Sequence, residues 1–155
     1  MKAQAGEMTR AVRGAIQVAV NSATEIGRAA ARLVTEVLRA NGIAENHIVS
    51  IMFSLTEDLT AANPATGLRR TGYAATPLFC TQEPRIDGAL PRVIRALVTF
   101  DSLERRPSVP IYLDGAEALR PDLGEGDTDE GSTSGGNQQG NNTSGGKRPP
   151  RGEAG

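Results

Sequence analysis

Residues 92–100, RVIRALVTF, decide what kind of fold this chain can adopt. Apolar side chains recur at every second position from Ile94 to Phe100, which is the alternation of a strand with one buried face. Arg95 falls on the opposite face of the same strand. An unpaired guanidinium is costly to bury, so this second face must offer Arg95 water or an anionic partner.

Four other segments extend the pattern to a sheet. We expect strands over residues 10–20, 47–55, 73–79 and 108–114. Arg13 lies on the polar face of the first strand, between two alanines. Pro77 removes a backbone donor from the third, which predicts an edge strand or a bulge there. The apolar faces of the first two strands are predicted to be Val12, Ile16, Val18 and Val20, and Val49, Ile51, Phe53 and Leu55.

One long helix is indicated between the first two strands. Ser22 and Glu25 have the spacing of a capping box, and Asn41-Gly42 is a typical helix end. Between them, apolar residues recur at helical spacing from Ile26 to Val37. A short helical turn is expected over 63–70, with Asn63 as its cap and proline at its first position.

These elements predict an α+β domain with a mixed five-stranded sheet, one long helix and a short helical turn. One helix covers one face of such a sheet. The other face carries Arg13 and Arg95, and the chain has little left to cover it. We therefore expect oligomerisation, with the arginines in a cleft between subunits.

The folded domain is predicted to span 10–123, after a flexible N-terminus over 1–9 in which Met8 is an alternative start. Residues 124–155 contain 10 of the 18 glycines, and Ala154 is their only residue of the hydrophobic class. Such a segment cannot bury enough apolar area to offset its ordering entropy, which predicts a disordered tail. The chain has a net charge of −1, no apolar run long enough for a bilayer and no secretory signal. We expect a cytoplasmic protein that binds neither nucleic acid nor membrane.

The lone cysteine, Cys80, raises the question of nucleophilic catalysis. A thiol nucleophile normally needs a histidine base, and the single histidine, His47, begins a different strand. A small buried residue is the favoured interpretation of Cys80. One histidine and one cysteine also predict no metal site. Arg13 and Arg95 fit either structural ion pairs or a bound carboxylate, and the pattern leaves these two readings nearly even.

An ordered set of motifs resembles the trimeric chorismate mutases of the α/β pseudo-barrel class. The resemblance runs from about residue 10 to 123 and rests on AVRGA (11–15), PATGLRR (64–70), CTQE (80–83), GALPRVIRALVTF (88–100) and VPIYLDGAEALRPDL (109–123). It implies a homotrimer that forms a pseudo-α/β-barrel, with active sites at the subunit interfaces. Asn63 and Thr66 depart from the family, which commonly has phenylalanine and often has lysine at these positions.

The resemblance also implies roles for individual residues. Arg13 would bind a substrate carboxylate, Glu83 the ring hydroxyl of chorismate, and Arg95 the ether oxygen and a carboxylate. Tyr112 would lie beside the side-chain carboxylate. The remaining substrate-binding positions are the rim arginine Arg69, the cleft residues Phe79, Cys80, Thr81 and Gln82, and Arg120 in a closing segment.

The implied reaction converts chorismate to prephenate, in phenylalanine and tyrosine biosynthesis, by an intramolecular Claisen rearrangement that needs no metal or cofactor. Catalysis would come from holding the substrate in its reactive shape and from positive charge at the ether oxygen. One alternative is a non-catalytic trimeric binding module for a small dicarboxylate. Another is a different trimeric enzyme of similar architecture, such as an imine deaminase, which the motifs at 80–83 and 119–123 disfavour.

Overall fold

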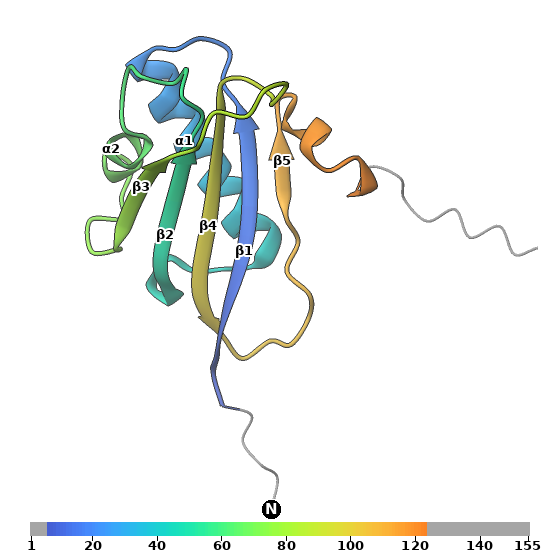
Figure 1. Ribbon diagram of the computed structural model, residues 1–155. Coiled ribbons are helices and arrows are strands. Elements are labelled where there is room, and N and C mark those ends of the chain that lie inside the picture. The colour runs from blue at the N-terminus through green and yellow to red at the C-terminus, as the bar shows by residue number, and fades with distance from the viewer. Residues whose placement is uncertain (1–5, 124–155) are drawn as a thin grey trace, which may run out of the picture. The chain divides into compact units, whose positions relative to one another are not determined.

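A computed structural model describes residues 6–123 of the chain (Figure 1). The predicted tail over 124–155 and the first five residues lie outside the described residues. The elements in chain order are β1 (Met8–Gln17), α1 (Ala23–Asn41), β2 (Ile48–Leu55), α2 (Pro64–Arg69), β3 (Leu78–Gln82), β4 (Val93–Ser102) and β5 (Ile111–Leu113), with short 3₁₀ turns at Glu45–His47, Ala116–Leu119 and Pro121–Leu123. Within residues 6–123, no helix has the length and apolar character needed to cross a membrane.

The five strands form one mixed sheet in the order β3-β2-β4-β1-β5. The central strand β4 pairs antiparallel with both β1 and β2, whereas the edge strands β5 and β3 pair parallel with β1 and β2. The predicted α+β class and the five-stranded mixed sheet are confirmed. The segment RVIRALVTF therefore lies at the centre of the sheet. One face of this strand belongs to the helix-covered face of the sheet, and the other belongs to the opposite face.

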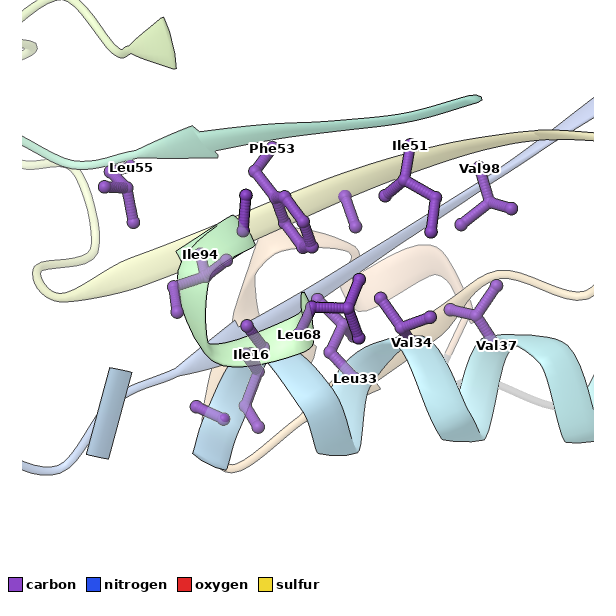
Figure 2. Close-up of a cluster of buried hydrophobic side chains, with 14 of the residues drawn as sticks. Ile16, Leu33, Val34, Val37, Ile51, Phe53, Leu55, Leu68, Ile94 and Val98 are labelled. Atoms are coloured by element: carbon purple, nitrogen blue, oxygen red, sulfur yellow. The ribbon is translucent and has the colours of Figure 1, made fainter. Parts of the chain in front are cut away.

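Helix α1 covers one face of this sheet (Figures 1 and 2). It begins where the Ser22 hydroxyl accepts a hydrogen bond from the Glu25 backbone N–H at 3.2 Å. The Glu25 carboxylate bonds Arg28 instead of returning to Ser22, so only half of the predicted capping box forms. The helix ends as predicted at Gly42, whose φ of 63° suits a residue without a side chain.

The hydrophobic core lies between α1, α2 and the inner face of the sheet (Figure 2). The largest fully buried side chains of this core are Phe53, Ile16, Ile26, Leu33, Ile51, Leu68, Ile94, Val18, Val34, Val37 and Val98. The alternation that predicted the strands holds for β4, in which Ile94, Ala96, Val98 and Phe100 face the core. The opposite face of the sheet, where Arg95 lies, is not covered by α1 or α2, and we call it the open face. A cavity lies on it.

Two valines assigned to the core are exposed instead. Val20 lies past the end of β1 and is 57% exposed, because the chain has already turned toward α1. Val49 is 42% exposed because a β-bulge between Ile48 and Ser50 adds one residue to β2 opposite β4. The bulge shifts the alternation by one position, so only Ile51, Phe53 and Leu55 keep the predicted facing.

The third strand begins later than the sequence indicated. It runs over Leu78–Gln82, whereas the prediction was 73–79, and β1 begins two residues before the predicted 10. Tyr73 has a φ of 60° and follows Gly72 at 140°, a backbone that no strand accommodates. The Tyr73 N–H is held by the Glu45 carboxylate at 3.0 Å. The third strand is an edge of the sheet, as predicted, but Pro77 lies immediately before it rather than inside it.

Helix α2 begins as predicted, with the Asn63 side chain accepting from the Ala65 N–H at 2.9 Å. It packs closely on α1, because Gly67 lies against Gly27. A Cβ atom built on Gly67 would come within 2.3 Å of the Gly27 Cα, which is a backbone atom and cannot rotate away.

Replacing Gly67 with alanine is therefore expected to lower the free energy of unfolding by about 1–3 kcal/mol, because the two helices must separate. Urea unfolding followed by circular dichroism measures this difference. Thr66→Ala, one residue away on the exposed side of α2, is the matched control and should stay within about 0.5 kcal/mol of the parent. An unchanged midpoint for Gly67→Ala would contradict the close helix contact.

Candidate active site

The pairing register brings three of the predicted site residues, Arg13, Arg95 and Tyr112, together on the open face. Ala15 on β1 pairs with Arg95 on β4 and with Tyr112 on β5, so these two side chains flank a small residue in one row across three strands. Arg13 lies two residues before Ala15, on the same face of β1. The small residue leaves space above the sheet that the surrounding polar side chains face.

A cavity of about 370 Å³ occupies this space. Four predicted site residues line it together: Arg13, Arg95, Tyr112 and Arg120. Ser54, Met52 and Leu97 line it from β2 and β4. The 3₁₀ turn over Ala116–Leu119 packs onto the open face through a small apolar cluster with Ala15 and Val93, and this contact carries Arg120 to the cavity.

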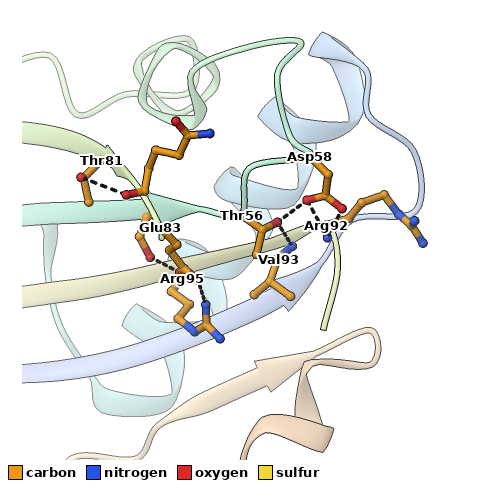
Figure 3. A network of polar contacts seen from close by, with 9 residues as sticks. Thr56, Asp58, Thr81, Glu83, Arg92, Val93 and Arg95 are labelled. Carbon is orange, nitrogen blue, oxygen red and sulfur yellow. Dashed lines mark hydrogen bonds and ion pairs between the residues drawn. The ribbon is translucent and has the colours of Figure 1, made fainter. Parts of the chain in front are cut away.

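Glu83 joins the site through an ion pair with Arg95 (Figure 3). The Glu83 backbone N–H donates to the Leu55 carbonyl at 2.7 Å, which fixes the residue immediately past the end of β3. Its carboxylate Oε2 accepts from Arg95, and its Oε1 accepts from the Ser54 hydroxyl at 2.5 Å. The Glu83 side chain is 20% exposed and that of Arg95 is 38% exposed. The sequence allowed Arg95 either a structural ion pair or a bound carboxylate ligand. The contact with Glu83 is an ion pair of the first kind.

Arg13 and Arg120 bring further positive charge to the cavity. Arg13 forms no ion pair with any residue in 6–123. Arg120 holds Asp122 through two hydrogen bonds of 2.8 and 2.6 Å. These bonds lower the pKa of Asp122, with a smaller contribution from the charge of Arg13, and they raise the pKa of Arg120. A dicarboxylate entering this cavity would therefore meet three arginines.

The other predicted site residues lie elsewhere on the domain. Phe79 and Thr81 pair with Met52 and Ser54, so they share the open face, but at the far edge of the sheet. Arg69 is exposed in the last turn of α2. A separate hollow of about 400 Å³ beside α2 is lined by Cys80, Thr81 and Gln82 together with Leu55, Leu59, Thr60, Ala62 and Asn63.

Cys80 is half-buried and faces the core rather than Glu83. It pairs with Phe53, whose ring is fully buried under the sheet, and it packs against the core cluster. Burial raises the pKa of the Cys80 thiol. The structure therefore agrees with the interpretation of Cys80 as a small buried residue, and it does not bring Cys80 and Glu83 together within one chain.

Because its pKa is raised, Cys80 should have a smaller thiolate fraction at pH 7 than a free cysteine. We expect iodoacetamide to alkylate Cys80 in the native protein several-fold more slowly than free cysteine, with the rate rising only at higher pH. Mass spectrometry over a pH series follows the reaction, and the urea-unfolded protein is the control. Alkylation faster than that of free cysteine at pH 7 would revive the nucleophile hypothesis.

A second polar network, which the sequence did not predict, fixes the start of β4 (Figure 3). The Asp58 carboxylate accepts from the Arg92 backbone N–H through both oxygens, at 3.1 and 3.0 Å. The Thr56 hydroxyl donates to Asp58 and accepts from the Val93 N–H. Arg92 has a φ of 53°, an uncommon conformation outside glycine that the two Asp58 contacts stabilise. The network anchors the chain three residues before Arg95.

Comparisons with known proteins agree with this geometry. The family model for chorismate mutase type I matches residues 9–123. The chain is 39% identical to the chorismate mutase AroH of Thermus thermophilus over 118 residues, covering 75% of this chain and 97% of the relative. It is 30% identical to chorismate mutase AroH of Bacillus subtilis (strain 168), covering 75% and 93% of the two chains.

A solved structure is also similar to this chain. The chorismate mutase from Clostridium thermocellum matches with a TM-score of 0.66 and 35% identity, covering 71% of this chain and 99% of that one. The sequence match, the shared fold and the arginine-lined cavity agree on one assignment. This chain belongs to the type I chorismate mutase family.

Proposed function

We propose that this chorismate mutase binds chorismate in the open-face cavity and rearranges it to prephenate with Arg95, Glu83 and Arg13 as the catalytic residues. The observation that carries the proposal is the Glu83–Arg95 pair beside a cavity that Arg13, Tyr112 and Arg120 also line. Chorismate has two carboxylates, one ring hydroxyl and one ether oxygen. The cavity lining supplies cations for the carboxylates and Arg95 as a donor for the ether oxygen, and Glu83, which is paired to Arg95, supplies an acceptor for the ring hydroxyl.

The chemistry requires only placement and charge. In the rearrangement the ether C–O bond breaks while a C–C bond forms at the other end of the same molecule, so no atom or proton is transferred to the protein. Arg13 and Tyr112 hold a carboxylate and keep the side chain over the ring, which lowers the entropic part of the barrier. Arg95 donates to the ether oxygen, on which negative charge accumulates in the transition state. Glu83 accepts from the ring hydroxyl.

The proposal includes a homotrimer whose subunits complete each other's sites. The site residues of one chain fall into two groups. The first group surrounds the cavity and consists of Arg13, Arg95, Tyr112 and Arg120, with Glu83 paired to Arg95. The second group lies at the β3 edge and on α2 and consists of Arg69, Phe79, Cys80, Thr81 and Gln82. Phe79 is 63% exposed at that edge. A neighbouring subunit that lays its β3 edge over the open face supplies the second group to the first. The cytoplasmic location expected from the sequence stays a prediction.

The activity is tested by incubating the purified protein with chorismate and following the loss of its ultraviolet absorbance, with prephenate identified as the product. The family assignment favours turnover over the alternative of a non-catalytic binding module. Binding of chorismate without conversion would overturn the proposed function in favour of that module.

Mixed trimers test whether two chains share each site. We expect Arg95→Ala and Arg69→Glu chains to be poorly active alone, because one lacks the ether-oxygen donor and the other places a negative charge at the rim. Co-expressed with different tags and purified through both, they should recover up to about a third of parental activity, since every mixed cyclic trimer has one interface in three that is intact on both sides. Replacing Arg69→Glu by Arg70→Glu, which changes the neighbouring arginine, controls for the charge change. Activity no higher than the mean of the two separate variants would contradict shared sites.

A further inference from the structure

Ser54 has a position in the site that the sequence did not assign to it. It pairs with Arg95 on β4 and with Thr81 on β3, so its side chain lies on the open face between the two strands that carry the ion pair. Its hydroxyl donates to Glu83 Oε1 at 2.5 Å. Ser54 is half-buried and lines the same cavity as Arg13, Arg95 and Tyr112.

The two oxygens of the Glu83 carboxylate are held by two different donors. Arg95 binds Oε2 and Ser54 binds Oε1. A glutamate side chain has three rotatable bonds, and one contact to Arg95 would leave the carboxylate free to turn about the C–C bond that carries it. The second contact fixes the plane of the carboxylate. An ionised carboxylate has about four acceptor positions, so two remain for a substrate hydroxyl.

The sheet itself fixes where these donors lie. Ser54 and Arg95 are cross-strand partners on adjacent strands, and the Glu83 N–H is bonded to the carbonyl of Leu55, the next residue along β2. The positions of all three residues are therefore set by backbone pairing rather than by a loop. A site built on paired strands holds its side chains more closely than a loop does.

We propose that Ser54 is a positioning residue of the reaction, which orients the Glu83 carboxylate toward the ring hydroxyl of chorismate. The inference rests on the role of Glu83 in the proposed function. Ser54 then acts through Glu83 rather than on the reacting atoms, and its contribution exists only while the Glu83 carboxylate is present.

A double-mutant cycle tests this dependence. We expect Ser54→Ala to lower kcat/KM about tenfold, because the carboxylate must be oriented anew in each turnover. Glu83→Ala should lower kcat/KM about a hundredfold or more. In the Glu83→Ala background, adding Ser54→Ala should change kcat/KM less than about twofold, since two residues that act as one unit are not additive. Ser54→Thr, which keeps the hydroxyl, should stay within about threefold of the parent.

The control is Ser50→Ala on the same strand, a half-buried serine that pairs with Thr99 and lies outside the cavity lining. It should keep parental kcat/KM. Circular dichroism and the oligomeric mass of every variant separate lost folding from lost turnover. Equal losses from Ser54→Ala with and without Glu83, or no loss at all, would overturn the role of Ser54. No loss from Glu83→Ala would overturn the proposed function of Glu83 instead, so the two failures are distinguishable.

Discussion

Replacing Arg95 with alanine is expected to lower kcat by about a hundred- to a thousandfold, which is the usual effect of removing one preorganised donor from a developing negative charge. Arg95 is the only cavity arginine among the described residues whose guanidinium already meets Glu83. Its loss removes the proposed donor to the ether oxygen and leaves the partly buried Glu83 carboxylate with the Ser54 hydroxyl as its remaining side-chain partner. Steady-state kinetics on chorismate measure both consequences, with the larger effect on kcat.

Arg95→Lys should recover little of this loss. Arginine has a planar fork of donors that can reach a carboxylate and a second oxygen together, whereas lysine is a compact point charge on a flexible stem. Arg28→Ala is the matched control, because Arg28 is an exposed arginine paired with Glu25 on α1, outside the cavity lining. It should keep parental turnover. If Arg95→Ala stayed folded and kept most of its activity, the electrostatic assignment would be wrong.

The sequence predicted the parts of the fold that depend on local periodicity. The strand over 92–100 alternates cleanly, and β4 buries every apolar residue that the alternation assigned to the core. The cap at Ser22 and the end at Gly42 are local signals too, and both appear in the structure. Errors arose where a distant contact decides the conformation. The bulge at Val49 depends on pairing with β4, and the late start of β3 depends on a turn that the Glu45 carboxylate holds.

The candidate site divides in the same way. Arg13 and Arg95 stood out because arginine interrupts an otherwise apolar strand, and the structure brings both to one cavity. Ser54 gave no such signal, since a serine on the polar face of a strand is ordinary. No sequence signal marked Asp58 either, because its partner is the backbone N–H of Arg92, 34 residues away in sequence. The sequence pattern reveals a charged side chain in an apolar strand, where burial would cost free energy. It does not reveal which residue contacts that side chain in the folded protein.

Replacing Leu97 with aspartate is expected to separate the subunits of the proposed trimer and remove at least about 99% of turnover. Leu97 is 42% exposed and Met52 is 48% exposed, and they are cross-strand partners on the open face. Two large apolar side chains at the middle of an uncovered sheet face are typical of a surface that another subunit covers. A carboxylate at Leu97 would be desolvated in that interface, and its cross-strand partner on β1 is Arg13, so the new charge would also occupy the cation proposed to bind a substrate carboxylate. If subunits complete each other's sites as proposed, turnover then falls because each cavity lacks the β3 edge of its neighbour.

Sedimentation velocity measures the mass of the variant, and the chorismate assay measures its turnover. The control is Leu103→Asp, which makes the same change at a residue that is 67% exposed past the end of β4. Leu103→Asp should stay trimeric and active, since the connection from β4 to β5 is outside the open face. A Leu97→Asp protein that remained trimeric would contradict the proposed interface. A monomer with full turnover would contradict a different claim, that the neighbour completes the site, because Arg13, Arg95 and Tyr112 would then suffice within one chain.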